Sequence, residues 1–364
     1  MSADLLYSDV EQSLRESVRN LLGSRLTPAD VMTGYDGVAD HSALWKALAG
    51  DLGLAALLIP EEFGGAGASS REAAVVLEEL GRTVAPVPYL SSAVIATIAV
   101  VVAGNESLAT ELADDTKTAA LAVPLSATGA NLELSVSLDG EVLSGRVTSV
   151  ADASTADVLI VPVLVAGGGM ELWAVDRAAA TVDAVVSLDM TRPLADLTFD
   201  GASGVKLASG DTAAKAVAKA LQTGAGLLAS GQLGLAQWCL DTTLAYVKER
   251  HQFGRAIGSY QAIKHRLADL WLEVGSASSA ARYAADCLAT GSEDTAVAVS
   301  LAQAYCSDVA VHAAEEAIQL HGGIGMTWEH PAHLYLKRAK ADQIALGTPD
   351  HHRSRLAELV DLRP

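Results

Sequence analysis

The chain has 364 residues, of which 50% are hydrophobic and 19% charged, so it can bury a large core and is not a disordered protein. Its 25 basic and 44 acidic side chains give a formal net charge of −19, which disfavours nucleic acid as a partner. The three cysteines lack metal-ligand spacing and are odd in number, so we expect no metal site, no disulfide framework and a cytoplasmic location. We expect no signal peptide and no membrane anchor, because the most apolar stretch, Ala93–Val102, is too short to span a bilayer.

Residues 1–116 are predicted to form a helical domain. Apolar residues recur at helical spacing between Leu5 and Leu22, and again over His41–Asp51, Ser69–Arg82 and Ser91–Val102. The loop Ile59–Gly67 contains a proline and three glycines, which stop one helix before Ser69 caps the next.

Residues 117–210 have the pattern of strands. Leu132–Leu138 alternates between apolar and polar residues, and Asp139-Gly140 then makes a tight turn. Short apolar segments follow at Val158–Val165, Glu171–Val175 and Val182–Leu188. We therefore expect a compact all-β domain, as a small barrel or a sandwich.

Residues 211–364 are predicted to form a bundle of four main helices, which makes the whole chain an α+β protein. The four segments are long, rich in alanine and apolar on several sides: Thr212–Glu249, Gln261–Ala289, Asp294–His321 and Pro331–Ala345. Such helices pack on each other and on partner subunits. Trp238 and Trp271 are expected in the bundle core, and His351 and His352 in a solvated tail.

Two motifs in this last region have the composition of a binding site. In the first, Arg250–Gln261, an arginine and glycines lie between two helices, an arrangement that suits a diphosphate. The alternative is a loop in which Phe253 fills the core and Arg250 pairs with an acid. In the second, Gln319–Met326, three glycines allow a backbone to approach a flat or phosphorylated group, or they simply end a helix.

The chain resembles the acyl-CoA dehydrogenases in its order of helices, strands and helices. The motifs that carry the resemblance are I-P-E-E-F-G-G-A-G at 59–67, R-H-Q-F-G-R-A-I-G-S-Y-Q at 250–261 and Q-L-H-G-G-I-G at 319–325. The resemblance implies FAD as the cofactor, an acyl-CoA thioester as the substrate and α,β-dehydrogenation as the reaction. It also implies that electrons pass to an electron-transfer flavoprotein. In this chemistry a glutamate removes the α-proton while the β-hydride passes to the flavin.

Both positions at which the family places that glutamate lack a carboxylate here. Leu346 precedes Gly347-Thr348, where many members read E-G-T, and Gly224 stands at the other position, before G-Q-L-G. Val123–Ala130 and Arg146–Val150 also depart from the segments that hold and shield the flavin ring in the family. The sequence therefore assigns no catalytic residue to this chain.

This combination resembles the non-catalytic subunit of the α2β2 acyl-CoA dehydrogenases that actinobacteria use on steroid-derived CoA esters. The late W-E-H at 328–330 points the same way. The resemblance implies that this subunit contributes to an FAD held mainly by a homologous catalytic subunit. The implied cofactor-binding residues are Arg250, Gln252, Phe253, Tyr260, Gln261, Gln319, Gly322 and Gly323. Two alternatives remain open: a self-sufficient homotetramer whose base is displaced, for example to Asp342 or Asp350, and a scaffold that binds no flavin.

Overall fold

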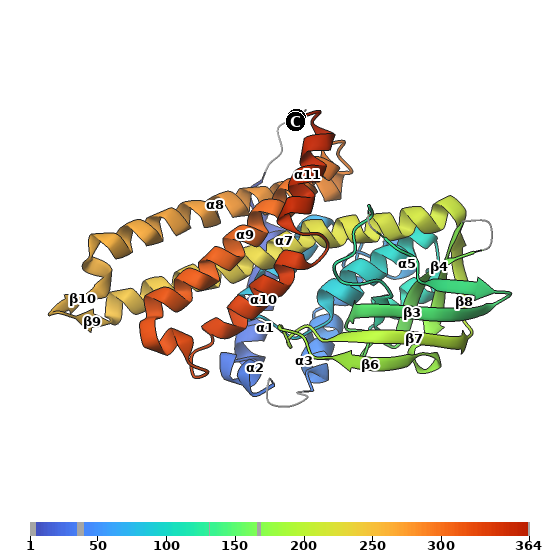
Figure 1. Ribbon diagram of the computed structural model, residues 1–364, viewed down its shortest axis with the longest axis horizontal. Helices are drawn as coiled ribbons and strands as arrows, with labels where there is room; N and C mark the ends of the chain where they lie inside the picture. The colour runs from blue at the N-terminus through green and yellow to red at the C-terminus, as the bar shows by residue number, and fades with distance from the viewer. Residues whose placement is uncertain (1–4, 35–39, 131, 166–168, 363–364) are drawn as a thin grey trace.

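The computed structural model describes residues 5–34, 40–130, 132–165 and 169–362. Figure 1 shows three parts in chain order: a group of N-terminal helices, a β-sheet and a set of long C-terminal helices. The predicted α+β architecture is confirmed. Among the residues described, no helix has the length and apolarity needed to cross a membrane.

The N-terminal part is helical because its segments begin with strong capping signals. Ser8 and Ser69 each form a reciprocal capping box, with Glu11 and Glu72 respectively, which satisfies the free N–H groups at the start of a helix. The elements are α1 (Asp9–Arg25), α2 (Pro28–Gly34), α3 (Ser42–Lys46), the π-helix η1 (Ala47–Asp51), the 3₁₀ turns η2 (Leu54–Ala56) and η3 (Glu61–Phe63), α4 (Ser70–Thr83), the π-helix η4 (Tyr89–Ala96), α5 (Thr97–Ala103) and α6 (Glu106–Ala113).

The middle part is one eight-stranded sheet whose order is β6-β7-β3-β2-β4-β5-β8, with β1 paired to β4. Its elements are β1 (Ala119–Leu121), β2 (Val136–Asp139), β3 (Val142–Ala151), β4 (Val158–Leu164), β5 (Met170–Asp176), the turn η5 (Arg177–Ala179), β6 (Thr181–Val185), β7 (Leu194–Ala202) and β8 (Val205–Ser209). Gly140 has a φ of 66° at the predicted turn between β2 and β3.

The sheet corrects two details of the strand prediction. It does not close into a barrel, because β6 and β8 form its two ends and do not pair across the residues described. The strand predicted over Val182–Leu188 stops at Val185. Beyond that residue the chain leaves the sheet and turns its polar side chains toward the helices.

The C-terminal part is built around one very long helix. It comprises α7 (Gly210–Glu249), β9 (His251–Gln252), β10 (Arg255–Ala256), the turn η6 (Ile257–Ser259), α8 (Gln261–Thr290), α9 (Thr295–His321), the turn η7 (Gly322–Met326), α10 (Ala332–Ile344) and α11 (Pro349–Leu359). The 40 residues of α7 extend about 60 Å, from the sheet at the right of Figure 1 to the β9–β10 hairpin at the left. Glycines let α4 cross α7 closely: a Cβ on Gly234 would lie 1.8 Å from the Glu78 carbonyl oxygen.

Two predictions about this part are wrong, and a third, Trp238 in the bundle core, is confirmed in part. The chain after Pro349 is not a solvated tail but the helix α11, and His352 is buried with its Nε2 2.9 Å from the Leu346 carbonyl oxygen. Trp271 is not in the core but 65% exposed on α8. Trp238 is partly buried and stacks on Tyr335, with ring centroids 3.5 Å apart.

Buried ion pairs join the loop before β7 to α10, and we call Asp189, Arg192, Arg338 and Asp342 the interdomain clasp. Arg192 donates to Asp342, and Arg338 donates to Asp189. Burial alone would raise the pKa of Asp189, but the two arginines hold it below its ordinary value. The Asp189 carboxylate therefore stays charged, and the two ion pairs fix the sheet against the helices.

Breaking the clasp should destabilise the fold more than losing a surface ion pair. Asp342→Leu leaves the buried Arg192 without its partner and should lower the free energy of unfolding by about 3–5 kcal/mol. The double variant Arg192→Met/Asp342→Leu should regain most of that loss, because no buried charge is then left unpaired. Urea unfolding followed by circular dichroism measures both. Arg353→Met, which removes an exposed pair with Asp308, is the control and should change little.

Candidate functional site

The first motif forms a rigid hairpin that displays an aromatic side chain. The strands β9 and β10 pair through Gln252 and Arg255. The two loop residues, Phe253 and Gly254, have φ values of 53° and 79°, as a two-residue hairpin requires. Positive φ is rare for a bulky residue, and the Phe253 side chain is 94% exposed. The interpretation of Phe253 as a core plug is therefore wrong.

The base of the hairpin is braced by its own neighbours. The guanidinium of Arg255 lies 3.8 Å from the centroid of the Tyr260 ring, and the Tyr260 hydroxyl donates to the Gln252 carbonyl at 3.4 Å. Arg250 caps α7: its N–H donates to Tyr246, and its carbonyl accepts from Ile257. These contacts hold the loop in one conformation.

The side chain of Arg250 is exposed and has no hydrogen-bond or ion-pair partner among the residues described. The surrounding segment 248–266 contains five basic residues and one acid, although the whole chain carries −19. Such a local surplus of positive charge attracts an anionic group. The alternative in which Arg250 pairs with an acid of its own chain is not seen.

The second motif meets the first at the same end of the helices. His321, the last residue of α9, is buried; its ring stacks on Tyr246 with centroids 4.4 Å apart, and the His330 ring lies tilted against it at 4.3 Å. Tyr246 lies four residues before Arg250, and His321 lies two residues after Gln319. This ring stack therefore brings the two motifs together, at the left end of the molecule in Figure 1.

The glycines of the second motif have different roles. A Cβ on Gly325 would lie 2.5 Å from the Ile318 carbonyl oxygen, and Gly322 has a φ of 63°, so the turn itself requires both. Gly323 faces open space: a Cβ there would meet nothing within 4 Å. Open backbone at Gly323 leaves room for a flat group.

Most of the sequence-predicted site residues lie exposed at this end. Arg250, Gln252, Phe253, Gln261, Gln319, Gly322 and Gly323 are exposed, and Tyr260 is half-buried. The Tyr260 hydroxyl contacts the Gln252 carbonyl directly. Within the described part of the chain, the site residues of the first motif, 250–261, form no hydrogen bond with Gln319, Gly322 or Gly323. The site is thus an open surface and not an enclosed pocket of this chain.

Sequence reasoning misses the apolar residues that extend this surface. Met326 is 82% exposed and Trp328 71% exposed, and the Lys337 ammonium lies 4.1 Å from the centroid of the Trp328 ring. The W-E-H sequence at 328–330 contains Trp328, but from the sequence alone it indicates only a family resemblance and not an exposed surface. Both side chains suit contact with another molecule.

The two positions that would carry a base adjoin each other in the core. Leu346 is 2% exposed. A Cβ on Gly224 would lie 3.2 Å from Leu346 Cδ1 and 2.7 Å from Ile95 Cγ1. Hydrocarbon side chains therefore surround both positions.

The acids considered as displaced bases are engaged elsewhere. Asp342 is buried in the interdomain clasp, and its main-chain oxygen accepts from Gln232. Asp350 is exposed on α11 and pairs with Arg353 at 3.0 Å. Each carboxylate thus has an arginine partner within the chain.

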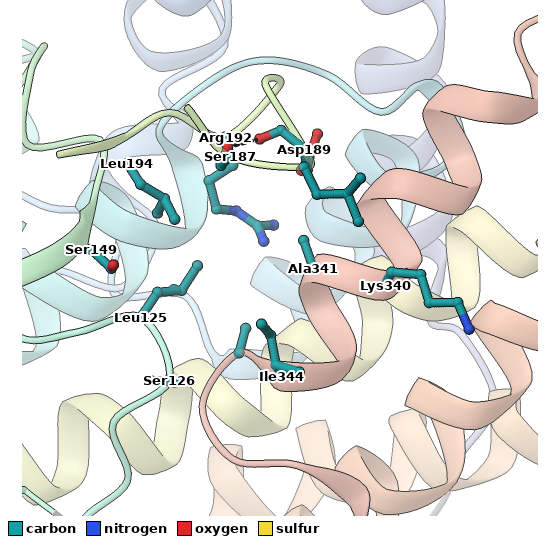
Figure 2. A pocket seen from close by; sticks show the side chains of 12 residues that line it. Leu125, Ser126, Ser149, Ser187, Asp189, Arg192, Leu194, Lys340, Ala341 and Ile344 are labelled. Carbon is teal, nitrogen blue, oxygen red and sulfur yellow. Dashed lines mark hydrogen bonds between the residues drawn. The ribbon is translucent and has the colours of Figure 1, made fainter. Parts of the chain in front are cut away.

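A cavity of about 220 Å³ lies between the sheet and α10 (Figure 2). It is lined by Leu125, Ser126, Ser149, Ser187, Leu188, Asp189, Arg192, Leu194, Lys340, Ala341, Ile344 and Ala345. Leu125 and Ser149 belong to the two segments that depart from the family's flavin-ring pattern. The charged groups deepest in this wall, Asp189 and Arg192, are already paired in the clasp.

The backbone around the cavity is also committed. The N–H of Leu125 donates to the Ser149 carbonyl at 3.0 Å, and its carbonyl accepts from Leu346 at 2.8 Å. Ser149 and Leu346 both have left-handed φ values, 56° and 55°, so this bridge holds two strained residues in place. The N–H groups of Leu125 and Leu346 are thus engaged within the chain, whereas the side chain of Arg250 and the backbone at Gly323 are open at the other end.

Comparison with known proteins identifies both helical parts of the chain. Residues 8–113 match the acyl-CoA dehydrogenase N-terminal domain, and residues 213–360 match the acyl-CoA dehydrogenase C-terminal domain. Acyl-CoA dehydrogenase IpdE2 of Mycolicibacterium smegmatis is 37% identical over 350 residues, which cover 96% of this chain and 98% of that protein. IpdE2 of Mycobacterium tuberculosis is 35% identical over 360 residues, 96% of each chain.

Similar solved structures include heteromeric complexes. A chain of the ChsE4-ChsE5 complex from Mycobacterium tuberculosis superposes with a TM-score of 0.86 at 25% identity, covering 100% of both chains. A chain of a variant of the Tcur3481-Tcur3483 steroid ACAD gives 0.84 at 27% identity, covering 97% of this chain and 98% of that one. Butyryl-CoA dehydrogenase from Megasphaera elsdenii shares the fold, with a TM-score of 0.89.

The ring stack should make the stability of this end depend on pH. Burial, together with the neighbouring His321 and His333, lowers the pKa of His330 from 6.5 to about 4. The folded chain then binds fewer protons than the unfolded chain between these values, so the free energy of unfolding should fall as the pH drops from 6.5 toward 4. His330→Phe keeps a ring but cannot be protonated, and should flatten that decline in urea unfolding at several pH values. His265→Phe, at an exposed site on α8, is the control; equal slopes for His330→Phe and the parent would contradict the assignment.

Proposed function

This chain belongs to the acyl-CoA dehydrogenase family, and we propose that it is the non-catalytic subunit of an α2β2 enzyme of that family. The enzyme carries out FAD-dependent α,β-dehydrogenation of an acyl-CoA thioester. The observation that carries the proposal is the contrast between two places in one chain. The two base positions, Leu346 and Gly224, are packed in hydrocarbon, whereas the surface around Arg250 and Gly323 is open.

In this proposal the open surface binds the ADP half of an FAD whose ring lies in the homologous catalytic subunit. The guanidinium of Arg250 donates to the diphosphate, where its planar fork matches two oxygens. The backbone at Gly322 and Gly323 allows close approach, and Phe253 and Gln319 pack against the same group. Gln252, Tyr260 and Gln261 support the loop that presents them.

When bound, FAD would accept the hydride that leaves the β-carbon of the thioester. The residues of this chain bind and orient that cofactor from across the subunit interface. They neither remove the α-proton nor polarise the thioester carbonyl. Both of those tasks belong to the catalytic subunit, which must supply a glutamate.

We assign a bulky, steroid-derived CoA ester as the substrate class and an electron-transfer flavoprotein as the electron acceptor. The similarity to a steroid ACAD supports the first assignment. The heteromeric nature of that protein and of the ChsE4-ChsE5 complex supports an assembly of two different homologous chains. Exposed Met326 and Trp328 beside the ADP-binding surface support a protein contact there.

Removing the guanidinium of Arg250 should weaken FAD binding by the complex. Arg250→Ala deletes a charge-assisted contact worth about 1.5–3 kcal/mol, so the dissociation constant of FAD should rise by about one to two decades. Titration of the flavin-depleted complex with FAD, followed by flavin fluorescence, measures this change. Lys248→Ala is the matched control, because Lys248 is also exposed two residues earlier and lies outside the proposed contact. Unchanged FAD affinity in Arg250→Ala would refute the assignment.

The isolated chain should not dehydrogenate any acyl-CoA. General-base catalysis contributes about 10²–10⁴-fold to a rate, and neither Leu346 nor Gly224 can accept a proton. The purified chain is assayed with added FAD, a panel of CoA esters and an artificial electron acceptor, alone and after co-expression with homologous, glutamate-bearing subunits. Activity and yellow colour should appear only with a partner. Turnover by the chain alone that disappears in Asp342→Asn or Asp350→Asn would instead establish a self-sufficient homotetramer.

A further inference from the structure

Three aromatic rings, those of Tyr246, His321 and His330, meet where the two motifs leave the helices. The Tyr246 ring on α7 stacks on the His321 ring at the end of α9, and the His330 ring, which precedes α10, lies against His321 as well. The helices α7 and α9 pack along each other, and this ring stack ends their contact on the side of the motifs. His321 at its centre is 3% exposed.

The ring stack is tied to Arg250 through the end of α7. Tyr246 lies one helical turn before Arg250, and its carbonyl accepts a hydrogen bond from the Arg250 N–H at 2.8 Å. This bond caps the helix, so the backbone of Arg250 follows that of Tyr246. The Tyr246 ring is half-buried against the hydrophobic core. Whatever holds this ring therefore also fixes the point from which the Arg250 side chain extends.

The ring stack is tied to the glycines through His321. This residue directly precedes Gly322, and its Nδ1–H donates to the Ala317 carbonyl at 2.6 Å, because a carbonyl oxygen can only accept. The ring is thus anchored to the last turn of its own helix. The turn η7 folds back on the same residue: a Cβ on Gly325 would lie 3.0 Å from His321 Cβ. The position of His321 therefore sets where the open backbone at Gly323 lies.

His330 holds the ring stack from the side of α10. Its Nδ1 accepts from the N–H of Ala332, the first residue of α10, at 3.2 Å, so this nitrogen carries no proton and the ring is neutral. The titratable groups that act on it are His321 on α9 and His333 on α10, and Lys337 in turn acts on His333. A neutral ring adds no repulsion to a stack that lies among positive groups.

A ligand that two motifs hold at once needs them at one fixed separation. Such a ligand binds only the fraction of molecules in which both motifs are correctly placed, and its apparent dissociation constant rises as that fraction falls. A ligand held by one motif alone does not depend on the separation. This difference distinguishes positioning from a general loss of packing.

We propose that the ring stack positions the two motifs for the cofactor: it fixes Arg250 and Gly323 at the separation at which both reach the same ADP group. The three stacked residues are positioning residues, which act on the ligand through Arg250 and Gly323. The inference rests on the proposed function, which places an ADP group at this surface.

Removing the Tyr246 ring in the co-purified complex tests the proposal. Tyr246→Leu keeps an apolar side chain but breaks the stack, so the dissociation constant of FAD should rise about threefold to tenfold, the value of one aromatic ring contact. Tyr246→Phe keeps the ring and should restore the affinity of the parent. Titration of the flavin-depleted complex with FAD, followed by flavin fluorescence, measures these constants, and circular dichroism confirms that each variant is folded.

The matched control breaks a different stack on the same helix. Trp238 lies about two helical turns before Tyr246 and stacks on Tyr335 of α10, away from both motifs. Trp238→Leu should therefore leave the dissociation constant of FAD unchanged. His321→Leu breaks the ring stack from the other helix, and it replaces Tyr246→Leu if that variant does not fold.

A double-mutant cycle with Arg250→Ala shows whether the ring stack acts through position. Positioning matters only while both motifs hold the ligand, so Tyr246→Leu should raise the dissociation constant by less than about twofold in the Arg250→Ala background. An equal rise in both backgrounds, or a similar rise in Trp238→Leu, would show a general loss of packing and overturn the proposal. If Arg250→Ala itself leaves FAD affinity unchanged, the proposed function and the positioning both fail. If Arg250→Ala weakens FAD binding but breaking the stack does not, only the positioning fails.

Discussion

The interdomain clasp is the interaction on which the arrangement of this molecule depends. Arg192 and Arg338 lie between Asp342 and Asp189 in an interior that would otherwise expel all four charges. Because each charge is costly to bury alone, the loop before β7 and the helix α10 must stay together. Their separation sets the width of the cavity and the position of the turn at Leu346.

The long helix α7 separates two regions that have different roles. Near its middle, Gly224 packs on Ile95 and Leu346, and the region is a dry core. At its C-terminal end, Arg250 and the hairpin face outward beside the second glycine motif, and the surface is charged and open. The helix holds the two regions a fixed distance apart. A substitution in one region can therefore leave the other region unchanged.

Sequence reasoning predicts the elements whose signals are local and misses those that depend on another molecule or on distant residues. The helical periodicity of Gln261–Ala289 and the caps at Ser8 and Ser69 are local, and the structure has helices there. Trp271 is predicted in the core because an apolar side chain on a long helix is usually buried by its own chain; on the outer face of α8 it is 65% exposed instead. His352 is predicted in a tail because its partner, the Leu346 carbonyl, is a backbone atom with no sequence signature. The eight residues predicted to bind the cofactor come from family resemblance, and the proximity of their two motifs becomes visible only through the stack of Tyr246 on His321.

The exposed tip of the hairpin and the exposed side chains of Met326 and Trp328 also bear on how a cell makes this protein. A newly synthesised chain that has found no companion displays Phe253, Met326 and Trp328 to water. Chaperones that hold unfolded chains recognise such surfaces, and proteases remove what remains orphaned. In the proposed α2β2 assembly, the abundance of this chain would depend on its companion as well as on its own gene.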